Sequence, residues 1–172
     1  MTIQELGALG EFLSSIAVFI SLVYLALQVR KSTDTERTTT YQSVVADFAG
    51  LSQSIACTEG MSQLIVRGME DFNSINADEK ARFVQLLFSM FHYFENIHYQ
   101  YQKGYLDEDV WLGWKRLMLS YFARPGVQDW WKARRAVYSE TFAVFLELGQ
   151  LEEPLLSYYE VTQLASPEND LT

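Results

Sequence analysis

The residues most able to do chemistry lie together in the middle of the chain, at His92, Glu95 and His98. Glu95 and His98 form a Glu-x-x-His pair, which in a helix places a carboxylate and an imidazole on one face, as in di-iron or di-manganese bundles. A dinuclear centre needs a second such motif, and because the chain has only two histidines a symmetric dimer would have to supply it. Glu95 and His98 are therefore the candidates for a metal site, but the sequence predicts neither a bound metal nor another cofactor.

A structural role for Glu95 is the favoured interpretation. On a helix Glu95 continues an apolar flank that contains Val84 and Phe88, so its carboxylate is expected to be partly buried. A carboxylate in that position needs a partner, and the candidates are Arg67, Arg116 or a tyrosine hydroxyl. The sequence contains no glycine-rich phosphate loop, zinc-ligand spacing or nucleophile–base arrangement that would favour an enzyme.

A second candidate surface lies between residues 111 and 135, where tryptophans and bases are interleaved. This composition is typical of a surface that rests on anionic lipid headgroups, to which each well-placed base contributes about 1 kcal/mol. The predicted membrane-surface residues are Trp111, Trp114, Lys115, Arg116, Trp130, Trp131, Lys132, Arg134 and Arg135. Alternatively, the bases pair with the seven acidic residues that follow residue 136, within one subunit or between subunits.

The elements that position these residues must come from 172 amino acids, enough for one domain of moderate size and one extra element. The chain is 49% hydrophobic and contains three prolines and nine glycines, so it can bury a sizeable core. Its formal net charge of −9 is unfavourable for nucleic acid, which is not predicted as a partner. The single Cys57 rules out an intrachain disulfide framework.

The N-terminal region predicts a transmembrane helix from Phe12 to Val29. These 18 residues carry no charge, and at the helical rise they cover roughly 27 Å, close to the hydrocarbon thickness of a bilayer. A cleavable signal peptide is disfavoured because the residues before the apolar run include Glu5 and no base. The remaining rival is the buried core helix of a soluble protein.

The charges that flank the apolar segment predict its orientation. Arg30, Lys31 and Arg37 follow it, whereas Glu5 and Glu11 precede it. Lysine and arginine are retained on the cytoplasmic side, so we expect a cytoplasmic helical domain and an outer N-terminus.

One face of the predicted span is lined with small residues. A heptad-like seam follows spacings of three and four residues and comprises Gly7, Gly10, Ser14, Ala17, Ser21, Tyr24 and Gln28. The opposite face is bulky and carries Phe12, Ile16, Phe19 and Val23. Small residues let helices approach closely in lipid, so the seam predicts a homo-oligomer with a left-handed crossing. Alternatively, the alignment is fortuitous, or the seam packs on another membrane protein.

The remaining pattern predicts an all-α fold, a helical bundle without strands. The residues from 32 to 42 contain no Gly or Pro, so the spanning helix is expected to continue to about Ala56, and a short helix follows over residues 61–72. Asn76 and Glu79 form a capping box for a helix that ends near Gly104. Further helices are expected after Asp107, from the Arg-Pro-Gly turn to about residue 137, and between residues 139 and 149.

The predicted organisation has three parts. They are a transmembrane anchor over residues 1–31, a cytoplasmic helical domain over 32–149 and an acidic C-terminal tail over 150–172.

Three stretches resemble an uncharacterised family of small bacterial single-pass membrane-anchored helical proteins. They are ALQVRKST at 26–33, FENIHYQYQKGYLDEDVW at 94–111 and RPGVQDWW at 124–131. The resemblance implies a bacterial origin, and therefore a bacterial inner membrane, and an anchor followed by helices. It assigns no activity and no functional residue.

These observations lead to three functional hypotheses. The first is a membrane-anchored scaffold or regulatory module that self-associates through its transmembrane helix, with the lipid bilayer as its first partner. The second is a small homo-oligomeric channel, since the seam also contains Ser14, Ser21, Tyr24 and Gln28, which could line a narrow path. The third is a metal-dependent enzyme that uses Glu95 and His98.

Overall fold

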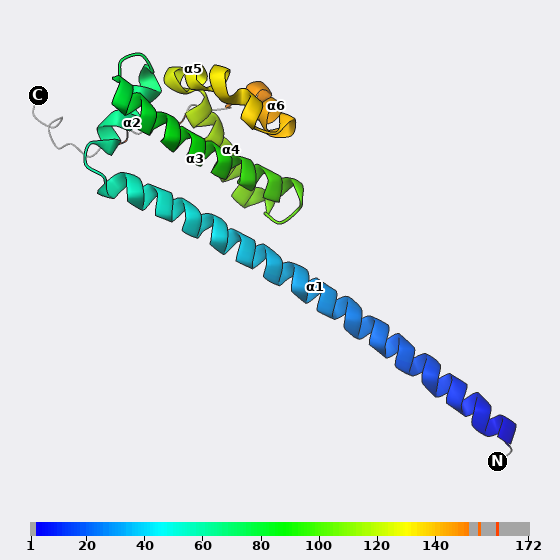
Figure 1. Ribbon diagram of the computed structural model, residues 1–172. Helices are drawn as coiled ribbons and strands as arrows, with labels where there is room; N and C mark the ends of the chain where they lie inside the picture. The colour runs from blue at the N-terminus through cyan, green and yellow to red at the C-terminus, as the bar shows by residue number, and fades with distance from the viewer. Residues whose placement is uncertain (1–2, 152–154, 156–160, 162–172) are drawn as a thin grey trace, which may run out of the picture. The chain divides into compact units, whose positions relative to one another are not determined.

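A computed structural model describes residues 3–151 together with Leu155 and Val161. Within these residues the chain forms helices and no strand, so the predicted all-α class is confirmed. The elements are α1 (Ile3–Cys57), α2 (Met61–Glu70), α3 (Ala77–Gln102), α4 (Glu108–Phe122), α5 (Pro125–Arg134), a 3-10 turn (Arg135–Val137) and α6 (Glu140–Leu148). Figure 1 labels the six α-helices along the chain.

The first helix, α1, is 55 residues long; it contains Gly50, but no proline interrupts it. It belongs to two compact units, Met1–Gln42 and Ser43–Thr172. By length and composition α1 can cross a membrane, and among the described residues it is the one helix that can. Its most apolar 18-residue window has a mean hydropathy of 2.2.

The third helix, α3, starts as the sequence predicts. The Asn76 side chain accepts a hydrogen bond from the Glu79 backbone N–H at 3.0 Å, and the Glu79 carboxylate accepts one from the Asn76 N–H at 3.0 Å. This reciprocal pair satisfies two donors that a helix start otherwise leaves open. Beyond the other end of α3, Gly104 adopts φ +75°, a left-handed conformation that glycine takes at little cost.

A close approach of α2 and α5 depends on two glycines. A Cβ atom placed on Gly126 would lie 1.8 Å from the backbone oxygen of Gly68, and a Cβ on Gly68 would lie 3.0 Å from the Phe83 ring. The two helix backbones therefore touch at this point. The contact fixes the start of α5 against α2.

Aromatic side chains fill the core of the second unit, where α3 lies among the other helices (Figure 1). The rings of Phe83, Phe91, Phe94 and Phe142 are fully buried. Around Phe91 the rings meet at tilted angles, with the Trp130 centroid at 5.0 Å, a geometry that aromatic pairs favour. On α3, a stripe at helical spacing (Phe83, Leu87, Met90, Phe94 and Ile97) is buried, and Tyr101 at its end is partly buried.

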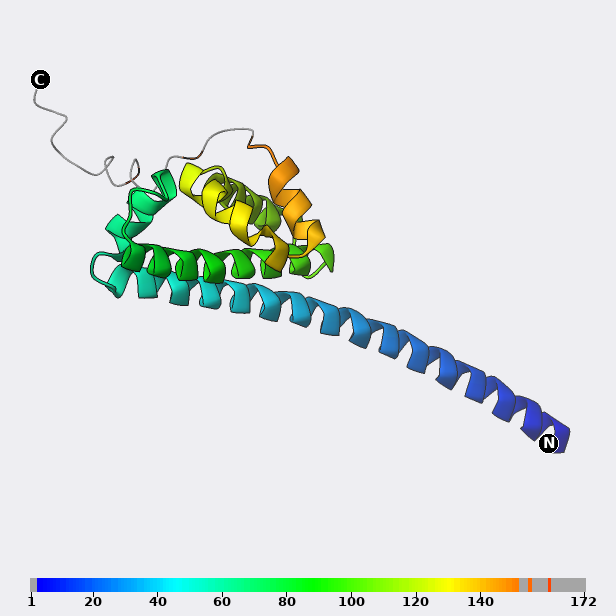
Figure 2. The ribbon, with the colours of Figure 1, turned by 45° about the horizontal axis from the view of Figure 1, so that its top comes forward.

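The last turns of α1 belong to this core. Figures 1 and 2 both show them beside α3. Phe48 stacks on Tyr93 at 5.7 Å and meets Trp114 edge-on at 5.0 Å. The Tyr93 hydroxyl donates a hydrogen bond to the backbone oxygen of Val44, whose side chain is buried. The same helix that carries the apolar segment thus ends as a packed element of the domain.

The element boundaries agree closely with the pattern in the sequence. Ser139 precedes α6 and Gly149 follows it, as predicted. The predicted anchor ends at residue 31, whereas the two compact units divide after Gln42. The polar residues 32–42 therefore belong to the first unit. Most of the predicted acidic tail over 150–172 lies outside the described residues.

Candidate functional site

All seven seam residues lie on one helix, and all seven are exposed. At 100° per residue they occupy an arc of about 100° on α1. Gly7 and Gly10 have open space where a side chain would stand, because nothing lies within 4 Å of an added Cβ atom. The geometry therefore places the predicted seam on a single accessible face.

Two hydroxyl groups within the apolar segment are bonded to their own helix. Ser15 donates to the Phe12 oxygen at 2.7 Å, and Ser21 donates to the Ala17 oxygen at 2.8 Å. A hydroxyl satisfied in this way does not need water, so these serines are compatible with a hydrocarbon environment.

The tryptophans of the second candidate surface correct the sequence analysis. Trp111, Trp130 and Trp131 retain only 5%, 2% and 4% of their surface exposed, and Trp114 is half-buried against Phe48. These indole rings pack in the core, where a large apolar ring gains more than at a wet surface, so they cannot rest on headgroups. A membrane-facing surface in this region would have to consist of the neighbouring bases and exposed aliphatic residues.

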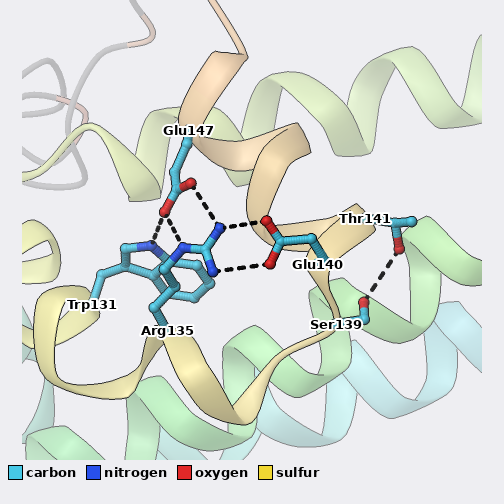
Figure 3. Close-up of polar contacts among 6 residues, drawn as sticks. All are labelled: Trp131, Arg135, Ser139, Glu140, Thr141 and Glu147. Carbon is cyan, nitrogen blue, oxygen red and sulfur yellow. Dashed lines mark hydrogen bonds and ion pairs between the residues drawn. The ribbon is translucent and has the colours of Figure 1, made fainter.

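Arg135 is held by carboxylates that follow it in the sequence (Figure 3). Its guanidinium donates to both carboxylate oxygens of Glu140, at 3.0 and 2.9 Å, and to both of Glu147, at 2.8 and 3.2 Å. The Trp131 indole N–H also donates to Glu147, at 3.1 Å. In the same view the hydroxyls of Ser139 and Thr141 are 3.4 Å apart.

This network shifts the proton equilibria of its members. Hydrogen bonds from Arg135 lower the pKa of Glu140, and those from Arg135 and then Trp131 lower the pKa of Glu147. The carboxylates in turn raise the pKa of Arg135. Pairing between the bases and the acids after residue 136, one of the two alternatives from the sequence, is therefore observed within one chain for Arg135.

The other bases of the stretch differ in their surroundings. Lys132 pairs with Asp129 at 2.8 Å, and Arg134 is exposed on the last turn of α5. Lys115 and Arg116 have no ion pair within the part of the chain that the structure describes. Both line a groove of about 500 Å³ beside α4, together with leucines from α4 and from the segment after α6.

Glu95 has a structural partner that the sequence analysis did not identify. One carboxylate oxygen accepts the backbone N–H of Ser139 at 2.7 Å, and the other lies 3.3 Å from Nδ1 of His92. A carboxylate beside the start of α6 interacts favourably with the positive end of that helix. The expectation of a half-buried glutamate is correct, but Arg67 is not its partner, because Arg67 pairs with Glu79.

His98 lies in an aromatic environment. Its ring stacks on Phe145 at a centroid distance of 4.7 Å, and its Nε2 lies 3.5 Å from the Gln102 amide. Burial lowers the pKa of the imidazole, and the nearby Glu95 carboxylate partly opposes that shift. No cluster of three or more His, Cys, Asp or Glu side chains able to hold a metal occurs among the described residues.

The Glu95–Ser139 contact joins positions 44 residues apart, so no local pattern could reveal it. The sequence held only an indirect signal. A carboxylate on an apolar flank requires a hydrogen-bond donor, and the backbone N–H groups at a helix start are such donors. The groove beside α4 was likewise hidden, although Leu112, Lys115, Arg116 and Leu119 share one helical face at spacings of three and four.

Comparison of this chain with protein-family models, with curated proteins and with solved structures finds no match. The resemblance drawn from three sequence stretches therefore remains a prediction, and the function must be argued from the residues themselves.

Proposed function

We propose that the chain is a membrane-anchored helical scaffold or regulatory module, with residues Phe12–Val29 crossing the bilayer once. The observation that carries this proposal is the exposure of the apolar segment. Its large side chains retain between 40% (Ile16) and 68% (Phe19) of their surface, and none of the most apolar window is buried. Soluble monomers rarely expose contiguous apolar patches beyond a few hundred Å², so lipid is the solvent that fits this surface.

The flanking charges support a cytoplasmic location for the domain. Arg30 and Lys31 follow the span directly and are exposed on α1. Bases retained on the inner side would place the helical domain in the cytoplasm and the N-terminus outside, in a bacterial inner membrane. The 13 residues from Arg30 to Gln42 are polar except Tyr41, as expected of a helix that has left the hydrocarbon.

Self-association through the seam is the second part of the proposal. Gly10, Ser14, Ala17 and Ser21 present backbone and small side chains to any neighbouring helix in the membrane. Close packing of that kind is driven by dispersion forces and by lipid entropy, and not by the hydrophobic effect. The domain would then be held as two or more copies side by side on the inner face.

The mass of the full-length protein in lipid nanodiscs tests this proposal. We expect an oligomer for the wild type and a monomer for Ser14→Leu/Ala17→Leu, because leucines in the seam separate the backbones. The control is Ile16→Leu/Val23→Leu, which places two leucines on the opposite, already bulky face and should leave the mass unchanged.

Three results would contradict the scaffold model. An unchanged mass for the seam variant would show that the seam is not the contact face. A monomeric wild type would show that the protein does not self-associate. A ring of four or more copies that conducts ions in planar bilayers would replace the scaffold with a channel.

A further inference from the structure

A groove of about 500 Å³ lies between α4 and the segment that follows α6. Its apolar lining comes from Leu112, Leu119, Leu151 and Leu155, and its polar lining from Lys115, Arg116 and Gln150. The volume is within the range of about 300–1,000 Å³ that ligand sites occupy. The groove therefore combines a leucine-lined floor with two adjacent bases.

The leucine floor continues past the groove. A second cavity of about 600 Å³ shares Leu119 and Leu151 with it and extends to Trp131 and Lys132. Leu112, at the end of the groove that lies away from this cavity, keeps 38% of its surface exposed. An elongated apolar ligand could cover this surface, and a small polar ion could not.

The charges of the groove are unusual for so acidic a protein. The chain carries a net charge of −9, yet Lys115 and Arg116 have no carboxylate partner among the described residues. Arg135, by contrast, is saturated by two carboxylates. Two adjacent bases without an ion-pair partner among the described residues are complementary to an anionic group, and arginine binds phosphate oxygens especially well.

We infer that this groove binds an anionic phospholipid, with the phosphate between Lys115 and Arg116 and an acyl chain along the leucines. The inference rests on the proposed membrane anchor, which would hold the domain where anionic lipids are abundant. A phospholipid supplies both a phosphate for the two bases and an acyl chain for the leucines. The membrane-surface function predicted for residues 111–135 would then be performed by a lipid-binding groove, with the tryptophans as its buried support.

The test is native mass spectrometry of full-length protein in a neutral detergent, titrated with short-chain phosphatidylglycerol or phosphatidylcholine. We expect one phosphatidylglycerol to bind with preference over phosphatidylcholine. At roughly 5-fold per base, Lys115→Gln/Arg116→Gln should weaken that binding about 30-fold. Leu112→Glu should also abolish it, because the new carboxylate repels the phosphate and interrupts the floor.

Two control variants separate the groove from other lipid contacts. Lys80→Gln/Arg82→Gln removes two bases from α3 and should change nothing. Arg30→Gln/Lys31→Gln removes the bases next to the span and should leave the groove-bound lipid in place. Loss of lipid only in this second control would assign binding to the span and overturn the inference.

Other outcomes reassign the occupant. If inorganic phosphate or phosphatidylcholine bound as tightly as phosphatidylglycerol, the result would contradict a site that needs both the bases and the leucines. Tighter lipid binding after neutralisation of Glu160, Glu168 and Asp170 would indicate that the tail of the chain itself occupies the groove, and would also overturn it. Short-chain lipids bind in water as well, so a soluble protein that still showed the 30-fold loss would refute the anchor while supporting the groove.

Discussion

The contact between α2 and α5 permits a sharp prediction, because Gly126→Ala places one methyl group against a backbone atom. The added Cβ would lie 1.8 Å from the Gly68 oxygen, whereas ordinary carbon–oxygen contacts begin at about 3.3 Å. The two helices must therefore separate by about 1.5 Å. A backbone oxygen cannot rotate away as a flexible side chain can, so the strain spreads into the core around Val127, which is fully buried.

Overpacking of this kind costs about 1–3 kcal/mol and occasionally more. Because the Gly68 backbone oxygen cannot move aside, Gly126→Ala should lie at the upper end of this range. We expect a loss of about 3 kcal/mol in the free energy of unfolding and a fall of roughly 10 °C in Tm. Gly113→Ala is the matched control, because Gly113 is exposed within α4 and an added Cβ there meets nothing within 4 Å. It should gain about 0.5–1 kcal/mol through helix propensity.

Urea titration of full-length protein in detergent, followed by near-ultraviolet circular dichroism of the buried tryptophans, measures these differences. Gly68→Ala should fall between the other two variants, because its Cβ would meet the Phe83 ring at 3.0 Å and a ring can shift slightly. It also keeps the test usable if Gly126→Ala does not fold. Equal stabilities for Gly126→Ala and Gly113→Ala would refute the close approach of α2 and α5.

Three further predictions concern charge and sidedness. Arg135 lowers the pKa of Glu140 and Glu147. Its ion pairs therefore stabilise the protein above about pH 4.3 and are lost as the carboxylates become protonated. Arg135→Gln should reduce the fall in Tm between pH 5 and pH 3. Glu95→Ala should cost about 1–2 kcal/mol on urea titration because a backbone N–H at the start of α6 loses its acceptor, and Glu95→Gln should restore part of it. In spheroplasts of a bacterial host, a membrane-impermeant maleimide should label Cys57 only after lysis, whereas Gln4→Cys in a Cys57→Ser background should react from outside; the reverse pattern would invert the topology.

Local signals explain why the helix boundaries could be predicted. The Asn76–Glu79 capping box and Gly104 act within a few residues of the helix ends that they define, so their effect is visible in the sequence alone. The length of α1 follows in the same way from the absence of a proline within it. The sequence thus predicted where these helices begin and end.

Tertiary packing explains what could not be predicted. Alternating bases and tryptophans between residues 111 and 135 look like one amphipathic surface, but α4 and α5 turn their indoles inward and leave the bases outside. The partner of Glu95 depends on where α6 starts in space, and the groove depends on the path of the chain after Gly149. Contacts between residues this far apart have no periodic signature in one sequence.

Fractionation of cells that express the full-length protein tests the membrane anchor most directly. Membranes are washed with alkaline carbonate and then with urea, which remove peripheral proteins, and are finally treated with detergent. If acyl chains solvate Phe12–Val29, the protein should stay in the pellet through both washes and dissolve only in detergent. Recovery of the protein as a water-soluble monomer in the first supernatant would contradict the account.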